Sequence, residues 1–318
     1  NLEFEFISAI HYLSKDKLDK IAFLDGNGEL NERQVFDISG FLSFSKGSSL
    51  NNFNLSCYYN VDRFDIKVFA LDSTETQPNL SRQLAMMNAY KVIIIAKPTI
   101  PFNNLEKLLI DQYVMSGGKI LWLVDGVYAG MDSLQNKSGD FVAVKNDLNI
   151  DDQLKKYGVQ INANLIEDLR STKISIITEY SNNKPQESLF NWPYFPLLKS
   201  DNEHVITKGL DGIKCNFVSS IDTVKNNINK TILLHSSKQS RLNPAPTKIS
   251  LGILEHPPKI ESYNKAYEPI AILLEGEFES IFKESLVQKN NDIQLKNKSI
   301  PTKMIVVADG DLISNDVS

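Results

Sequence analysis

The sequence contains little cysteine and no long apolar run. Cys57 and Cys215 are the only cysteines among 318 residues, which is too few for a disulfide framework. We expect ordinary core or surface thiols rather than a disulfide bridge or a reactive site. No apolar stretch approaches the roughly 20 residues of a membrane-spanning helix, and no signal peptide opens the chain. Because the sequence starts at Asn1 rather than Met, we expect any membrane anchor to lie outside it.

An excess of positive charge is also missing. The chain carries 34 Lys and Arg against 39 Asp and Glu, a net charge of -5, and the charges are scattered without a basic stripe. Since positive surfaces recruit nucleic acid and anionic lipid, we expect no nucleic-acid partner. A hydrophobic content of 42% is ordinary for a folded globular protein. The length predicts about two domains, or one domain with a large insertion.

The common motifs of enzymes and cofactor-binding proteins are absent. A dinucleotide-binding G-x-G-x-x-G would need a third glycine where Asn31 follows Gly26 and Gly28. No P-loop motif occurs, and the strand-ending turns carry Asp or Lys where a nucleophile elbow needs Ser or Cys. The histidines are dispersed without metal-binding spacing: His11, His204, His235 and His256. We therefore expect no cofactor, no metal and no catalytic residue.

Three apolar runs that end at Asp-Gly are the most informative pattern present. They are KIAFLDG, KILWLVDG and MIVVADGD, which end at Asp25-Gly26, Asp125-Gly126 and Asp309-Gly310-Asp311. A fourth run, KVIIIAK, spans Lys91 to Lys97. Continuous apolar runs of this length are typical of strands buried on both faces of a parallel sheet.

The ends of these strands predict one candidate site. Parallel strands bring their carboxyl ends to the same edge of a sheet, where open α/β sheets usually bind ligands. The candidate ligand-binding or partner-binding residues at this edge are Asp25, Glu29, Lys97, Asp125, Asp309 and Asp311. Converging carboxylates could hold hydroxyl groups of a polar ligand or a lysine of a partner loop. The alternative is ordinary turn chemistry, in which Asp bonds its own backbone and Gly takes the unusual φ.

The order of predicted elements indicates an α/β fold with a mostly parallel sheet flanked by helices. Helical spacing over Ser81 to Tyr90 and Asn104 to Met115 alternates with the strands. After about Asp140 several strand patterns follow without intervening helices, which predicts an inserted mixed α/β subdomain. The predicted domains are a parallel α/β core at 1–140, the inserted subdomain at 141–300, and a returning strand of the core at 301–318.

An aromatic segment, FNWPYFP, lies within the predicted loop from Ser181 to Glu203. We expect its two prolines to exclude a regular element and its rings to be packed. If the rings were exposed, they would form an interface of an assembly module. The residues of this possible interface are Phe190, Trp192, Tyr194 and Phe195.

Several longer segments of the chain resemble the GldG family, the gliding-motility-associated auxiliary or "substrate-binding" components of ABC transporters in Bacteroidetes. The matching segments are GNGEL (26–30), IIAKP (94–98), FNNLEKLLIDQYVMSGGKILWLVDGV (102–127), MDSL (131–134), LKKYGVQIN (154–162), PYFPLL (193–198) and TKMIVVADGDLISN (302–315). The resemblance runs in order from about Leu2 to the end. One departure is Asn27, where related chains commonly have His in a GHGE turn.

The resemblance implies a membrane-anchored protein at the periplasmic face of the inner membrane, with its membrane helices and an upstream domain outside this sequence. It implies an ABC permease subunit as partner, a cytoplasmic ATPase reached through that subunit, and a role in gliding motility and the linked secretion machinery. The implied fold is similar to a glutamine-amidotransferase-like α/β domain shared with some intraflagellar-transport proteins, without that class's catalytic cysteine. It supplies no catalytic residue.

Three functional hypotheses follow. The first is a non-enzymatic exoplasmic domain that binds a polar small molecule, a glycan or a partner protein through the predicted sheet edge. The second is a purely structural assembly module that uses the aromatic segment. The third is a carboxylate-based glycan-acting enzyme, which would need two carboxyl groups roughly 5 to 10 Å apart across a cleft.

Overall fold

The computed structural model describes residues 18–43, 59–67, 79–136, 138–181, 184–200, 204–283 and 294–315. Its contacts divide the chain into two compact units, which we call unit 1 (residues 1–122, 275–304 and 313–318) and unit 2 (residues 123–274 and 305–312). The predicted domain bounds at 140 and 300 stay predictions. Cys57 lies outside the described residues.

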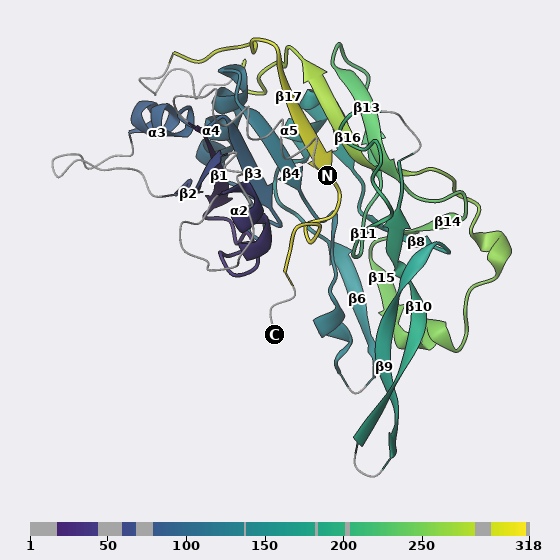
Figure 1. Cartoon of the computed structure of the whole chain (residues 1–318). Helices are drawn as coiled ribbons and strands as arrows, with labels where there is room; N and C mark the ends of the chain where they lie inside the picture. The colour runs from purple at the N-terminus through teal and green to yellow at the C-terminus, as the bar shows by residue number, and fades with distance from the viewer. Residues whose placement is uncertain are drawn as a thin grey trace. The chain divides into compact units, whose positions relative to one another are not determined.

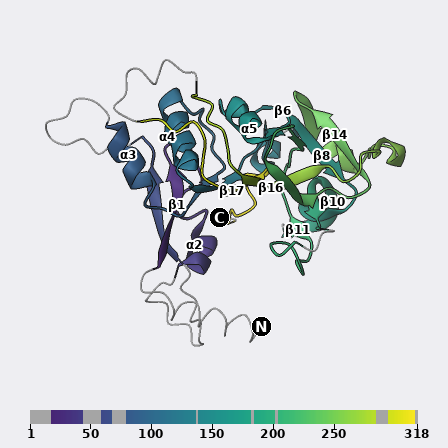
Figure 2. The same cartoon turned by 90° about the horizontal axis from the view of Figure 1, so that it is seen from above.

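Unit 1 alternates strands with helices in the order that the sequence predicts. Its elements are β1 (Asp19–Asp25), α2 (Phe36–Leu42), β2 (Tyr59–Asp65), α3 (Leu80–Met87), β3 (Val92–Ala96), α4 (Asn104–Met115) and most of β4 (Lys119–Leu123). α3 and α4 lie side by side in both Figure 1 and Figure 2. The strand interiors form the core of this unit, because the residues from Ile21 to Leu24 and from Ile93 to Ala96 are buried.

Unit 2 consists mainly of strands, most of them short. They are β5 (Val127–Tyr128), β6 (Asp140–Lys145), β7 (Val159–Ile161), β8 (Asn164–Asp168), β9 (Ser171–Ser181), β10 (Lys184–Leu198), β11 (Ile213–Lys214), β12 (Ile221–Thr223), β13 (Asn229–His235), β14 (Ser240–Pro244), β15 (Thr247–Ser250) and most of β16 (Pro269–Gly276). Its helical elements are α5 (Asp151–Tyr157) and the 3-10 turns η1 (Met131–Leu134), η2 (Leu251–Leu254) and η3 (Ile260–Ser262). The last strand, β17 (Thr302–Val307), has residues in both units.

The four apolar runs form strands of one sheet, as predicted. The seven-stranded sheet has the order β13-β16-β17-β4-β3-β1-β2 (Figure 1). β1 is parallel to both β2 and β3, with Ile21 opposite Val61 and Val92 respectively. The predicted α/β fold class is confirmed. Antiparallel pairs occur in the small sheets of unit 2, for example β8 with β14 and β6 with β15.

Helix α4 shows how local sequence sets the bounds of an element. Asn103 Oδ1 accepts hydrogen bonds from the backbone N–H groups of Leu105 and Glu106, and Glu106 Oε2 accepts one from Asn103 N at 2.9 Å. This capping box satisfies N–H groups that a helix leaves without intrahelical partners. At the other end Gly117 has φ +95°, a conformation that favours glycine. The predicted range Asn104–Met115 is confirmed.

The prediction that prolines exclude a regular element from the aromatic segment is wrong. Residues Lys184–Leu198 form β10, which pairs with β9 as a long antiparallel ribbon (Figure 1). The ladder is interrupted between Asn191 and Pro196, so Pro193 stands where no cross-strand N–H is needed. An irregularity in the ladder is a place where a strand tolerates proline, and the spacing of the two prolines alone did not reveal it.

Candidate functional site

Three of the predicted carboxylates come together in unit 2. Asp125 follows β4, and Asp309 and Asp311 follow β17. One carboxylate oxygen from each of the three residues lies within 4.8 Å of the other two. We call Asp125, Asp309 and Asp311 the acid cluster. Its formation agrees with the prediction that neighbouring strand ends bring their Asp-Gly turns to one edge.

Backbone contacts between the two turns hold the cluster together. Val124 N, just after β4, donates to the oxygen of Val307, the last residue of β17, at 3.0 Å. Asp125 Oδ1 then accepts a hydrogen bond from Gly310 N at 2.6 Å. Asp309 Oδ1 accepts from Asp311 N at 2.8 Å, closing a local Asx turn. Each Asp-Gly turn therefore supports the other as well as itself.

A third segment, residues 215–219, closes over Asp309. Asn216 N donates to Asp309 Oδ2 at 3.0 Å, and Ser219 N donates to Ala308 O at 3.0 Å. The side-chain Oδ1 of Asn216 is buried and has no hydrogen-bond partner in the described part of the chain. Cys215 is a free, buried cysteine beside the cluster. Burial raises the pKa of its thiol well above the usual value, and the charge of Asp309 acts in the same direction. It is a packed thiol, as expected.

Burial and mutual repulsion set the electrostatics of the cluster. Asp309 is fully buried, and this burial, with the charges of Asp125 and Asp311, raises its pKa from 3.8 to about 7. The hydrogen bonds from Asn216 N and Asp311 N act in the opposite direction but are outweighed. Like charges at this separation disfavour ionisation of all members at once. The cluster can therefore hold a proton near neutral pH or accept a positively charged group.

Gly126 is required by close packing rather than by an unusual φ. A Cβ atom at this position would lie 2.6 Å from both Asn162 O and Ser219 Oγ. We expect Gly126→Ala to reduce the free energy of unfolding by about 1–3 kcal/mol, because backbone would have to move. Urea denaturation measures the change. Gly130→Ala is the matched control, since no atom lies within 4 Å of a Cβ there, and an equal loss in both variants would contradict this explanation.

The other three residues of the predicted site at the sheet edge belong to unit 1. Asp25 forms an ion pair with Arg63 of β2 through two side-chain nitrogens. Glu29 Oε2 accepts a hydrogen bond from Asn27 N at 2.7 Å, and burial raises the Glu29 pKa from 4.5 to about 7. Lys97 follows β3 and has φ +53°. None of these three residues is a member of the acid cluster. The residues of the predicted site therefore do not form one group.

The predicted aromatic interface is wrong for three of its four rings. Trp192, Tyr194 and Phe195 are buried in a core cluster of unit 2, and the fourth ring, Phe190, is half-buried. The rings of Trp192 and Tyr194 lie 5.4 Å apart. These three side chains cannot form the exposed patch that the assembly-module hypothesis requires. The expectation that the rings are packed is confirmed.

Unit 2 contains a buried ion pair that no pattern in the sequence predicted. Glu167 of β8 is fully buried and accepts hydrogen bonds from Arg241 Nε at 2.8 Å and Arg241 Nη2 at 2.7 Å. Asn243 and Tyr263 also donate to this carboxylate. These partners are more than 70 residues away in the chain, and the pairing of β8 with β14 brings Arg241 and Asn243 to Glu167. A charge satisfied in this way has a structural role.

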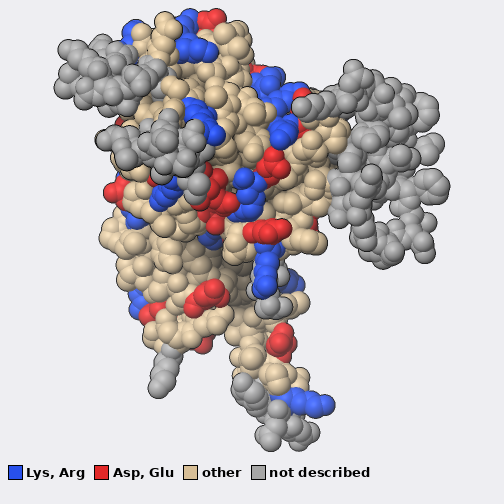
Figure 3. Space-filling model, turned by 90° about the vertical axis from the view of Figure 1, so that its left-hand side faces the viewer, with Lys and Arg blue, Asp and Glu red and all other residues tan. Residues whose placement is uncertain are grey.

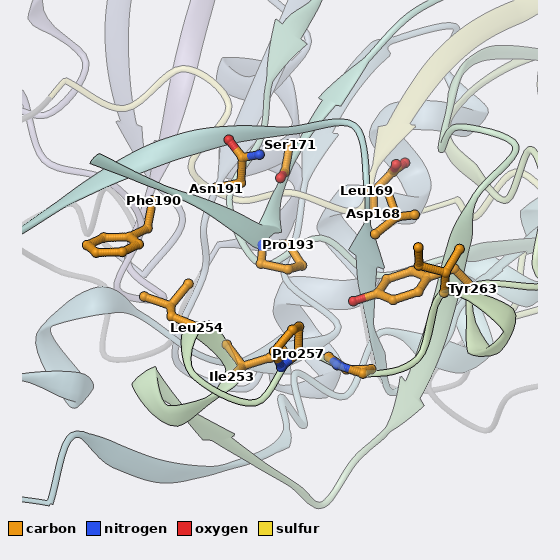
Figure 4. A pocket seen from close by; sticks show the side chains of 12 residues that line it. Asp168, Leu169, Ser171, Phe190, Asn191, Pro193, Ile253, Leu254, Pro257 and Tyr263 are labelled. Carbon is orange, nitrogen blue, oxygen red and sulfur yellow. The ribbon is translucent and has the colours of Figure 1, made fainter. Parts of the chain in front are cut away.

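Unit 2 also contains an open pocket of about 330 Å³ between the base of the β9–β10 ribbon and the segment 253–263 (Figure 4). Most of its walls are apolar, including Phe190, Ile253 and Leu254. Asp168 is the one carboxylate among its lining residues, and it is occupied by hydrogen bonds from Arg170 N and Ser237 N. The pocket lacks the carboxylate pair that the glycan-hydrolysis hypothesis needs.

The charged surface agrees with the scattered charge of the sequence. Figure 3 shows acidic and basic side chains interspersed on the face that it draws, without a stripe of one sign. Several form exposed pairs, for example Lys91 with Asp19 and Lys303 with Glu275. No helix in the described residues is both long and apolar enough to cross a membrane.

Comparisons with known proteins place the chain in a family. No curated protein matches it. Among solved structures, one titled "mmIFT52 N-terminal domain" is similar with 13% sequence identity and a TM-score of 0.48, and the match covers 93% of this chain and 89% of that chain. A family of auxiliary components, described as "ABC-type uncharacterized transport system", matches residues 18–318. Because this match spans nearly the whole sequence, the chain belongs to the ABC-type transport system auxiliary family.

Proposed function

We propose that this chain is the non-enzymatic recognition domain of an ABC-transport auxiliary protein, and that the acid cluster is its contact point for a positively charged group. Family membership supports the association with a transport system. The single observation that carries the site is the convergence of Asp125, Asp309 and Asp311 within 4.8 Å. The group recognised is an ammonium or guanidinium of a partner loop, with the permease subunit as the partner.

A partner can reach the acid cluster through Asp311, its one partly exposed member. Asp311 is half-buried, whereas Asp125 and Asp309 are buried. A lysine or arginine that contacts Asp311 would also feel the charge of the other two carboxylates. Such a charge-assisted hydrogen bond is stronger than a neutral one. The same burial argues against glycosidase chemistry, because a fully buried Asp309 cannot reach a glycosidic oxygen.

The resemblance to the GldG family motivates the biological setting of this proposal. We propose the periplasmic face of the inner membrane, membrane anchoring by segments outside this chain, and coupling through the permease to a cytoplasmic ATPase. The process served is gliding motility. Replacing the gene by one that encodes a cluster variant should impair spreading of cells on a surface, whereas normal spreading with undiminished permease binding would contradict the proposal.

The test is co-purification of the full-length protein with its permease subunit from native membranes. We expect Asp125→Asn combined with Asp311→Asn to reduce the recovered permease about tenfold or more. Removing the charge of one partner in an interfacial charge pair commonly costs about 1.4 kcal/mol or more of binding free energy. Asp132→Asn is the matched control, since Asp132 is exposed in the same unit but lies outside the cluster. Unchanged recovery from a folded double variant would refute the site.

A thermal-shift measurement separates a protein partner from a small cation. The purified domain is screened with Ca²⁺, Mn²⁺, spermidine and a lysine-rich peptide. A shift with a divalent metal alone, lost in the double variant, would replace the partner loop by a metal as the occupant. A shift with the peptide that the double variant loses would support the proposed recognition of an amine.

A further inference from the structure

The turn after β1 contains two buried acceptor oxygens that lack donors. Asn27 is fully buried, and its side-chain Oδ1 has no hydrogen-bond partner among the described residues. Glu29, two residues later, has the same deficiency at Oε1. A buried polar atom without a partner costs about 1–3 kcal/mol, so two such acceptors in one turn need a physical explanation.

The remaining polar atoms of these two side chains are well occupied. Asn27 Nδ2 donates to Glu106 Oε2 at 3.1 Å and to the carbonyl oxygens of Ile100 and Pro101 at 3.3 and 3.2 Å. This pattern fixes the orientation of the Asn27 amide, because reversing it would place an oxygen against three acceptors. Glu29 Oε2 accepts from Asn27 N at 2.7 Å. A protonated Glu29 carboxyl group would supply the donor that these two oxygens lack.

We propose that Glu29 is protonated at neutral pH and that its hydroxyl group donates to Asn27 Oδ1, so that one proton closes the turn after β1. This inference concerns unit 1 and is independent of the acid cluster. The proposal rests on the two deficient acceptors and on the fixed orientation of the Asn27 amide. The burial that raises the Glu29 pKa from 4.5 to about 7 is consistent with it.

The charged groups near the turn come from several elements. Asp25 at the end of β1 raises the Glu29 pKa, and Lys67 after β2 lowers it. Arg63 is engaged by Asp25, and Glu106 lies 3.9 Å from Lys67 Nζ while accepting from Asn103 and Asn27. Asp65 approaches Gly26, and Lys97 follows the neighbouring strand β3. Of these groups, Asp25 disfavours the charged form of Glu29 and Lys67 favours it, and burial, which has the largest influence, favours the neutral form.

With Glu29 protonated, the turn after β1 holds the segment that follows β3 by hydrogen bonds, an arrangement that we call the clamp. Asn27 O accepts hydrogen bonds from Thr99 N at 2.9 Å and Ile100 N at 2.8 Å, and Thr99 Oγ1 donates to Gly28 O at 3.1 Å. Ionisation of Glu29 would place a charge against Asn27 Oδ1 and remove the bond between them. Residues 97–101, which include the predicted site residue Lys97, are then released as the pH rises above about 7.

Hydrogen exchange measures the clamp directly. For the wild-type chain we expect the protection of amides 99 and 100, corrected for intrinsic rates, to fall about tenfold from about pH 6 to about pH 8.5. In Glu29→Gln the amide Nε2 replaces the hydroxyl as a permanent donor, so protection should stay constant. Glu32→Gln, an exposed neighbour, should behave like the wild type, and amides 109–115 of α4 should show no fall of that size.

A second measurement does not depend on opening of the loop. With glutamate labelled at its carboxyl carbon, the resonance that disappears in Glu29→Gln should titrate with a midpoint near pH 7. A midpoint below about pH 5 would mean a charged Glu29 at neutral pH and would overturn the proposal. Protection at amides 99 and 100 that is independent of pH in the wild type would overturn the clamp.

Discussion

Raising the pH from about 4 to about 7 is expected to destabilise this protein, with Asp309 responsible for the largest share. Its pKa rises from 3.8 to about 7 on folding because the carboxyl group is buried and faces Asp125 and Asp311. A group whose folded pKa is raised stabilises the fold fully below the unfolded value. That stabilisation is lost as the pH rises through the folded value. The window therefore runs from about pH 4 to about pH 7.

The expected size follows from the shift. At about 1.4 kcal/mol per pKa unit, Asp309 accounts for a loss on the order of 4 kcal/mol across this window. Glu29 acts in the same direction, since its pKa also rises, from 4.5 to about 7. Urea denaturation at closely spaced pH values gives the free energy of unfolding as a function of pH.

Asp309→Asn tests the assignment. The amide keeps an acceptor for one of the two backbone N–H groups and cannot ionise, so the curve should become flatter between about pH 4 and pH 7. Asp132→Asn, at an exposed position, should retain the wild-type slope. If Asp309→Asn leaves the slope unchanged in a Glu29→Gln background, the raised pKa does not belong to the acid cluster.

Trp192→Ala is expected to reduce the free energy of unfolding by about 3–5 kcal/mol, the range for removing a large aromatic side chain from a core. Trp192 is 0% exposed and packs against Tyr194. If the aromatic segment were a surface for assembly, the same substitution would weaken association and leave the stability of the isolated domain nearly unchanged.

Leu189→Ala provides the control on the same strand. Leu189 is 65% exposed, so its truncation should change stability by about 0.5 kcal/mol or less. Denaturation in urea compares the two variants, and circular dichroism establishes that both are folded. Equal losses in the two variants would mean that the interior of unit 2 is not packed around Trp192.

The sequence predicted the strands and their ends well because both are local properties. Apolar runs such as Ile21–Leu24 have to be buried on both faces, and the Asp-Gly pairs that follow them favour turns. The bounds of α4 were equally accessible, since Asn103, Glu106 and Gly117 carry the capping and termination signals within the helix's own neighbourhood. The predicted site residues Asp125, Asp309 and Asp311 follow from the same reasoning.

What the sequence could not determine is which strand ends are neighbours. In the sheet, β17 lies next to β4, while β3 separates β4 from β1, so Asp125 meets Asp309 rather than Asp25. The order depends on pairing between segments nearly 200 residues apart, for which no local pattern exists. The β9–β10 ribbon was missed for a different reason, because its ladder is irregular where Pro193 stands and the proline spacing does not reveal that.

By itself, the sequence determined that buried strands end in acidic turns, because both burial and turn formation depend on residues that are adjacent in the chain. Only the tertiary structure decided the chemistry of those acids. Whether a carboxylate such as Asp309 is solvated or holds a proton near neutral pH depends on segment 215–219 and on Asp125. Desolvation and charge repulsion act through space, and distant parts of the chain supply both.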